Sequence, residues 1–153
     1  MGHIRHTFHV DAPPERVWEL AADAERIPEW NVSFIEVKDV SGPLDRVGAS
    51  YTSVLKLAGR RLEGRWELTG VEKPSLTELT GSARGGGRGT YAAHYEAADG
   101  GTDVTWELDY ELPGSFVGGI ADKLFVERAN ERDFRHSAEN FKAIIEAEVT
   151  AHA

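Results

Sequence analysis

The stretch Tyr91–Leu112, YAAHYEAADGGTDVTWELDYEL, contains two alternating segments joined by a turn. Residues 91–97 and 103–112 alternate apolar and polar side chains, which is the period of a β-strand with one buried face. Asp99-Gly100-Gly101 lies between them and is a turn signal, so the stretch predicts an antiparallel hairpin. One face of its second arm is formed by Val104, Trp106, Leu108, Tyr110 and Leu112. Such a one-sided strand belongs to a sheet that needs a cover on its apolar face.

The rest of the chain supplies the sheet and the cover. Further strand patterns run over residues 4–10, 32–40, 49–57, 61–69 and 76–80, and two short helices are expected between the first two strands, ending near Trp30. A long helix is expected from about Phe116 to Val149. We therefore expect one α+β domain over residues 1–150. It consists of a curved antiparallel sheet of about seven strands, two short helices and one long C-terminal helix, with a cavity between sheet and helix.

Composition excludes several classes of function. The chain has 153 residues, no cysteine, and 26 acidic against 17 basic residues, which gives a formal net charge of −9. Without cysteine there is no disulfide, Cys-ligated zinc, iron–sulfur cluster or thiol nucleophile. The acidic balance argues against nucleic acid and anionic membrane surfaces as partners. No apolar run approaches the roughly 18 residues of a membrane-spanning helix, so we expect a cytoplasmic protein without an integral membrane segment.

Histidines give no support to a metal site. His3, His6 and His9 lie on one predicted strand, where His6 points away from the other two. No Ser-His-Asp arrangement can be placed either. We therefore expect neither a metal nor a cofactor.

Aromatic residues on the inward strand faces are candidates for a ligand-binding wall. They combine a large apolar surface with polar tips, as expected around a flat or hydrophobic small molecule. Packing of an ordinary core is the alternative for any one of them. The candidates on the strands are Tyr51, Ser53, Trp66, Tyr91, Tyr95, Trp106 and Tyr110, and Trp30 on the second helix is a candidate cap over the mouth.

The final helix carries a polar feature on its apolar stripe. At 100° per residue, Leu124, Phe134 and Phe141 fall near one face, and Glu127 and Glu131 fall on that face one turn apart. Burying an unpaired carboxylate costs several kcal/mol. The two glutamates therefore face a wet cavity, pair with Arg128 or Arg135, or lie where the helix overhangs the sheet. In the first case they and Leu124 would contact a ligand.

Several segments resemble the START-like superfamily with the Bet v 1-type helix-grip fold (SRPBCC). Within it, the similarity is to bacterial polyketide cyclase/dehydrase and lipid-transport proteins and covers nearly the whole chain. The segments are Ala12-Pro13-Pro14-Glu15-Arg16-Val17-Trp18, Ile27-Pro28-Glu29-Trp30, Arg65-Trp66-Glu67-Leu68-Thr69, Gly100–Trp106 and Glu139-Asn140-Phe141-Lys142. The resemblance implies a helix-grip fold and leaves the reaction open, because family members include carriers, receptors and cyclases.

The leading hypothesis is a binding protein that carries or sequesters a hydrophobic or aromatic small molecule, such as a lipid, isoprenoid or polyketide. The alternative is a cyclase, aromatase or dehydratase that uses the same cavity, with Tyr110 or Glu131 as acid or base. Relatives with cyclase chemistry use an inward arginine, whereas Arg65 is predicted to point outward here. Relatives that condense amines use an inward lysine, and Lys56 is also predicted outward. A protein-interaction module, as monomer or homodimer, is the third hypothesis.

Overall fold

The fold is a seven-stranded sheet wrapped around a long helix. The computed structural model describes residues 2–57, 59–114 and 120–151. Every neighbouring pair of strands is antiparallel, in the order β1-β7-β6-β5-β4-β3-β2. The strands are β1 (Gly2–Val10), β2 (Phe34–Lys38), β3 (Ser50–Leu57), β4 (Arg60–Glu72), β5 (Leu76–Ala83), β6 (Arg88–Ala98) and β7 (Gly101–Glu111). The N-terminal strand therefore forms one edge of the sheet and the next strand in sequence forms the other.

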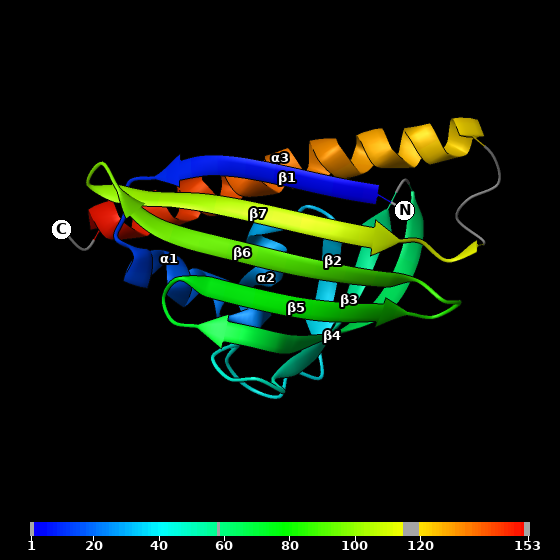
Figure 1. The fold of residues 1–153 in the computed structure, drawn as a ribbon, viewed down its shortest axis with the longest axis horizontal. Coiled ribbons are helices and arrows are strands. Elements are labelled where there is room, and N and C mark those ends of the chain that lie inside the picture. Colours follow the sequence, from blue (N-terminus) through cyan, green and yellow to red (C-terminus); the bar gives the residue numbers. More distant parts are fainter. Residues whose placement is uncertain (1, 58, 115–119, 152–153) are drawn as a thin grey trace.

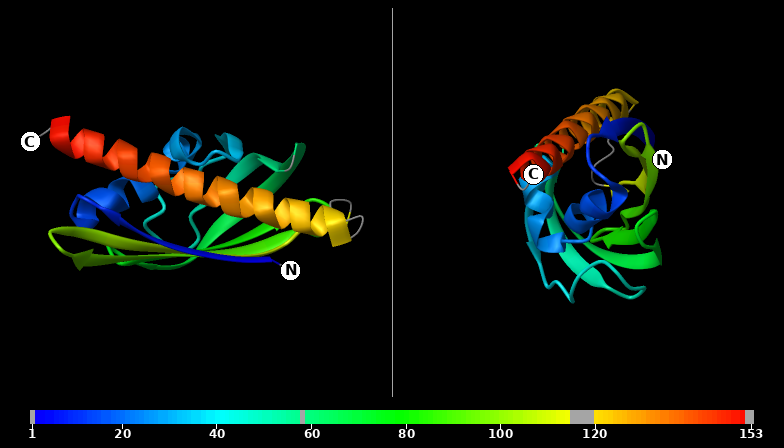
Figure 2. Two further views of the ribbon diagram at one scale, coloured as in Figure 1. Left: turned by 90° about the horizontal axis from the view of Figure 1, so that it is seen from above. Right: turned by 90° about the vertical axis from the view of Figure 1, so that its left-hand side faces the viewer.

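Helical segments connect these two edges and cover the concave face. Between β1 and β2 lie α1 (Pro14–Ala21), a 3-10 turn (Ala24–Arg26) and α2 (Ile27–Trp30), and α3 (Ile120–Ala151) follows β7. Pro14 stands in the first turn of α1, where its missing N–H costs no hydrogen bond. Figure 1 shows β3 and β2 curling behind β5 and β6, and Figure 2 shows α3 lying along the open side of the resulting trough.

Polar contacts hold α3 on both sides of the trough. Toward β1, the Lys142 ammonium donates to the carbonyl of His9 at 2.8 Å, and the Asp11 backbone N–H donates to Glu146 at 2.8 Å. Toward α2, the Arg26 guanidinium donates to Glu148 at 2.6 Å. The helix is thereby fixed to the edge of the sheet at β1 and to the 3-10 turn that precedes α2.

An aromatic cluster centred on Trp106 fills the middle of the trough. The Trp106 ring lies 5.0 Å from Phe8, 5.3 Å from Trp30 and 5.2 Å from Phe141, measured between centroids. Trp106 is 2% exposed and Phe141 is fully buried. The cluster therefore joins β1, α2, β7 and α3 in one core.

The predicted fold class and the helix-grip architecture are confirmed. The alternation in 91–112 gives the observed hairpin, with Tyr91 opposite Leu108 and Ala93 opposite Trp106. Several strands are longer than predicted, since β1 begins at Gly2, β4 extends to Glu72, β5 extends to Ala83 and β6 begins at Arg88, whereas β2 is shorter and covers only Phe34–Lys38. The predicted start of the last helix at Phe116 lies outside the described residues. No helix in the described part of the chain is long and apolar enough to cross a membrane.

The position of Phe141 at the centre of this core gives a first prediction. Phe141→Ala removes a fully buried ring between helix and sheet and should lower the free energy of unfolding by about 3–5 kcal/mol. Urea denaturation followed by circular dichroism measures the change. Ala147→Ser on the exposed face of the same helix is the control and should shift it by less than about 0.5 kcal/mol. Equal stability of the two variants would contradict the role of Phe141.

Candidate functional site

A cavity lies between α3 and the concave face of the sheet. Its volume is about 200 Å³. Strands β3 to β7, the segment from α2 to β2, and the middle of α3 contribute to its lining. At one end it reaches the tips of the β3–β4 and β5–β6 hairpins and the end of β7, where Leu62, Arg88 and Leu112 line it. We refer to this end as the mouth.

Glycines opposite aromatic rings give the sheet side of the cavity a flat wall. Trp66 pairs with Gly81 on the next strand, and Gly81 pairs with Gly89 on the strand after that. A Cβ atom on Gly81 would lie 2.7 Å from the Trp66 ring, and one on Gly89 would lie 3.2 Å from it. Trp66 therefore lies across both glycines. Tyr110 lies in the same way over Gly2 of β1, so the glycines are required by the aromatic rings above them.

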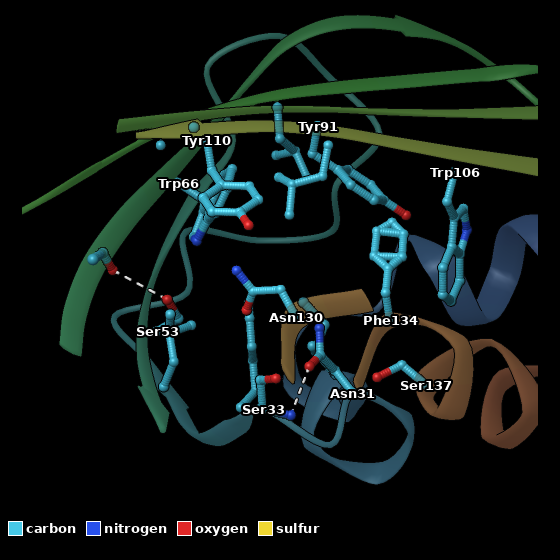
Figure 3. A pocket seen from close by; sticks show the side chains of 18 of the residues that line it. Asn31, Ser33, Ser53, Trp66, Tyr91, Trp106, Tyr110, Asn130, Phe134 and Ser137 are labelled. Atoms are coloured by element: carbon cyan, nitrogen blue, oxygen red, sulfur yellow. Dashed lines mark hydrogen bonds between the residues drawn. The ribbon is translucent and has the colours of Figure 1, made fainter. Parts of the chain in front are cut away.

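Polar side chains line the opposite side of the cavity. Figure 3 shows Trp66, Tyr110 and Tyr91 on one side, and Asn31, Ser33 and Asn130 across from them. The Asn31 side-chain oxygen accepts a hydrogen bond from the Ser33 backbone N–H at 3.0 Å. The Ser33 hydroxyl donates to Asp133 of α3 at 3.3 Å. The cavity is thus apolar along the sheet and polar where α3 meets the segment after α2.

Phe134 and Trp106 separate the cavity from the core. Their ring centroids are 5.5 Å apart in an edge-to-face arrangement, and Figure 3 shows Phe134 between Tyr91 and Trp106. The indole N–H groups of Trp30 and Trp106 are buried and have no hydrogen-bond partner among the described residues. Each such group costs about 1–3 kcal/mol, which the surrounding aromatic packing must offset.

The structure brings most of the predicted site residues together. Eight of the eleven candidates line the cavity: Trp30, Tyr51, Ser53, Trp66, Tyr91, Tyr95, Trp106 and Tyr110. Trp30 is 8% exposed and packs 5.1 Å from Phe141, so it belongs to the inner aromatic cluster and is not a cap over the mouth. Whether these residues bind a ligand stays a prediction.

The remaining three candidates, Leu124, Glu127 and Glu131, lie outside the lining. Leu124 is 48% exposed, so its predicted place on the inward stripe is wrong; Glu131 is exposed and Glu127 is half-buried, so of the three orientations left open for the glutamates the cavity-facing one is not observed. The helical wheel included Leu124 in the inward stripe because it is apolar, whereas the residues of α3 that line the cavity lie to one side of that stripe. Both glutamates raise the pKa of Tyr110, so they lie near the end of β7.

Sequence reasoning missed the polar residues that α3 contributes. Asn130, Asp133 and Ser137 line the cavity beside Phe134 and Phe141. Their spacing of three and four residues places them on the same helix face as the two phenylalanines. That spacing was a usable signal. It was overlooked because a search for apolar periodicity gives polar positions no weight.

Burial controls the ionisation of the tyrosines. Burial raises the pKa of Tyr51, Tyr91 and Tyr95 well above the ordinary value of 10.0, and the neighbouring Tyr95 and Tyr51 raise the pKa of Tyr91 further. Burial also raises the pKa of Tyr110, although a hydrogen bond with Asn130 opposes the shift. All four phenols are therefore protonated at neutral pH.

Charged side chains occupy only the margins of this site. Arg88 and Glu111 at the mouth form an ion pair at 2.8 Å, and Asp133 lies 3.5 Å from Arg132. Arg65 and Lys56 point out of the cavity, as predicted; the Arg65 guanidinium donates to Ser50 at 2.7 Å and Lys56 is exposed. Among the described residues, no three His, Asp or Glu side chains come together as metal ligands.

Comparisons with known proteins agree with this geometry. The family described as "Polyketide cyclase / dehydrase and lipid transport" matches residues 1–146. No curated protein matches the chain. Among solved structures, TTHA0849 from Thermus thermophilus has 22% identity and a TM-score of 0.77, covering 95% of this chain and 98% of its own. A START superfamily protein from Mycobacterium smegmatis has 14% identity and a TM-score of 0.71, covering 96% and 99%. Ara h 8.0201 has 13% identity and a TM-score of 0.64, covering 95% and 97%.

Tyrosine titration tests the environment of the cavity. Because the pKa of each phenol is raised in the folded state, the native protein holds these protons above pH 10, where the unfolded chain releases them. The associated stability is present below about pH 10 and decreases as the pH rises toward the folded values. Absorbance at 295 nm should therefore show no phenol ionising near pH 10 until the protein unfolds. A tyrosine that ionises near pH 10 with intact circular dichroism would contradict its placement.

The contact between Trp66 and Gly81 gives a second test. Gly81→Ala places a methyl group against the ring and should destabilise the protein by about 1–3 kcal/mol, with a change in tryptophan fluorescence. Gly114→Ala is the control, because an added Cβ there meets no atom of the described part of the chain within 4 Å. Thermal unfolding and emission spectra measure both effects. If the two variants behave alike, Trp66 does not lie across Gly81.

Proposed function

The chain belongs to the polyketide cyclase / dehydrase and lipid transport family, and on that premise we propose that it binds a hydrophobic or aromatic small molecule in its cavity, to carry or sequester it. Lipids, isoprenoids and polyketides are the candidate classes. The observation that carries the proposal is a cavity walled by Trp66, Tyr91 and Tyr110, whose charged lining residues are paired. A cofactor is not part of the proposal. The proposal does include a cytoplasmic location, because a cysteine-free sequence suits a reducing compartment.

Cavity size limits the part of the ligand that is enclosed. A cavity of about 150 Å³ accommodates benzene, and drug-sized ligands occupy pockets of about 300–1,000 Å³. The volume of about 200 Å³ therefore supports a compact molecule of one or two rings, or one segment of a longer ligand. A flat molecule would lie along Trp66, whose ring is itself held flat by Gly81 and Gly89.

The enzyme hypothesis receives less support from the geometry. A cyclase or dehydratase needs an acid and a base at the same ligand. Of the two predicted catalytic candidates, Tyr110 lines the cavity and Glu131 does not. The carboxylates in the lining, Glu111 and Asp133, are each in an ion pair. These contacts favour binding over acid–base catalysis.

Native mass spectrometry of protein purified from its own host tests the proposal, and a co-purifying small molecule is the expected result. A matched pair of variants locates the site. Leu62→Trp adds bulk to a cavity-lining residue, whereas Arg61→Trp adds the same ring to its exposed neighbour. Calorimetric titration with naphthalene should show at least about tenfold weaker binding for Leu62→Trp and unchanged binding for Arg61→Trp. Equal effects of the two variants, or no bound molecule in either assay, would overturn the proposal.

A further inference from the structure

Three tyrosines line the same cavity, and we call their hydroxyls the inner hydroxyl cluster: Tyr51 from β3 and Tyr91 and Tyr95 from β6. Tyr51 and Tyr95 each affect the ionisation of Tyr91, so the three phenols are neighbours. The Tyr95 hydroxyl is hydrogen-bonded to the buried Thr77. Of the three phenols, Tyr95 therefore has a hydrogen-bond partner within the protein.

Tyr51 and Tyr91 have no such partner. No hydrogen bond among the described residues involves the hydroxyl of Tyr51 or that of Tyr91. Neither hydroxyl belongs to the fully buried polar atoms without a partner, so both are accessible from the cavity. Both residues line the cavity, so a molecule inside it can supply the missing acceptor. Because the pKa of each phenol is raised by burial, both hydroxyls are donors throughout the neutral pH range.

Electrostatics restrict the charge of that molecule. The charged lining residues are Arg88, Glu111 and Asp133. Arg88 is paired with Glu111 at the mouth, and Asp133 with Arg132. The lining thus offers no unpaired cation to a ligand carboxylate or phosphate, and a buried, unpaired anion is disfavoured by several kcal/mol. An ammonium group would also lose its hydration in this mainly apolar cavity, and the lining carboxylates Glu111 and Asp133 are already in ion pairs.

We infer that the ligand is an uncharged molecule whose carbonyl, ether or hydroxyl oxygen accepts hydrogen bonds from Tyr51 and Tyr91, with its apolar part against Trp66. The inference rests on the proposed function and narrows it, since it excludes free fatty acids, other carboxylates, phosphates and amines as the enclosed group. A neutral ketone, ester or alcohol of compact shape fits the volume, the apolar wall and the donors of Tyr51 and Tyr91 together. The indole N–H groups of Trp30 and Trp106, which line the deeper part of the cavity, are further donors for the same class of ligand.

Four ligands with one ring system and similar shape test this inference. They are 2-acetylnaphthalene, a neutral acceptor; 2-naphthoate, an anionic acceptor; 2-isopropylnaphthalene, which has no acceptor; and 2-(aminomethyl)naphthalene, a cation. Calorimetric titration at pH 7 should rank the ketone first, at least about threefold tighter than the hydrocarbon, as one hydrogen bond implies. The carboxylate and the ammonium should bind more weakly than the hydrocarbon.

Two variants test whether the hydroxyls of Tyr51 and Tyr91 cause the tighter binding of the ketone. Tyr51→Phe and Tyr91→Phe keep the ring and remove the hydroxyl, and each should weaken binding of the ketone about three- to tenfold. Affinity for 2-isopropylnaphthalene should stay unchanged in both, which also shows that the cavity is intact. Because Tyr51 is deeply buried, Tyr91→Phe provides an independent measurement if Tyr51→Phe fails to fold.

The possible failures are distinct. If the hydrocarbon binds but the carboxylate or the ammonium binds as tightly as the ketone, the inference is wrong and the proposed function stands. The same holds if both phenylalanine variants bind the ketone with unchanged affinity. If none of the four naphthalenes binds and no molecule co-purifies from the host, the proposed function and the inference fail together.

Discussion

One geometric constraint shapes this molecule: a single helix must cover the concave face of a seven-stranded sheet. Seven strands about 4.8 Å apart make a sheet about 29 Å wide, whereas a helix with its side chains is about 10–12 Å across. The sheet curls toward α3, which Lys142 and Glu146 fasten beside β1 and which Arg26 fastens to the 3-10 turn before α2. Trp106 and its aromatic neighbours fill one part of the remaining space. The part they leave is the cavity.

Most of this arrangement could be predicted because successive side chains of a strand point to opposite faces of the sheet. Assigning one residue to the inward face therefore assigns its neighbours as well. Once Trp106 is assigned to the inward face, Leu108 and Tyr110 must follow it, and the observed pairing agrees. The long helix was less predictable. Its inward face depends on how the helix lies against the sheet, which no local pattern specifies. Exposed Leu124 and inward Asn130 both violate the apolar rule on which the prediction relied.

The walls of the cavity depend on pairings between residues far apart in sequence. Trp66 can lie flat only because Gly81 and Gly89 occupy the neighbouring strands. Taken alone, each glycine is expected to weaken its strand. The strand register places both glycines under the Trp66 ring, where the missing side chains leave room for it. No single segment contains this information, so it became visible only when the three strands were placed side by side.

Ionised side chains and neutral hydroxyl groups occupy different parts of this protein, and this separation affects the chemistry of the cavity. The ionised side chains of an acidic chain lie outside the cavity or are paired at its margin, while the interior keeps neutral hydroxyl groups. Phenols whose pKa is raised far above neutrality donate hydrogen bonds but do not accept a proton from a substrate. Such neutral hydroxyls are hydrogen-bond donors to an oxygen acceptor, and they are suited to the uncharged ligand proposed above.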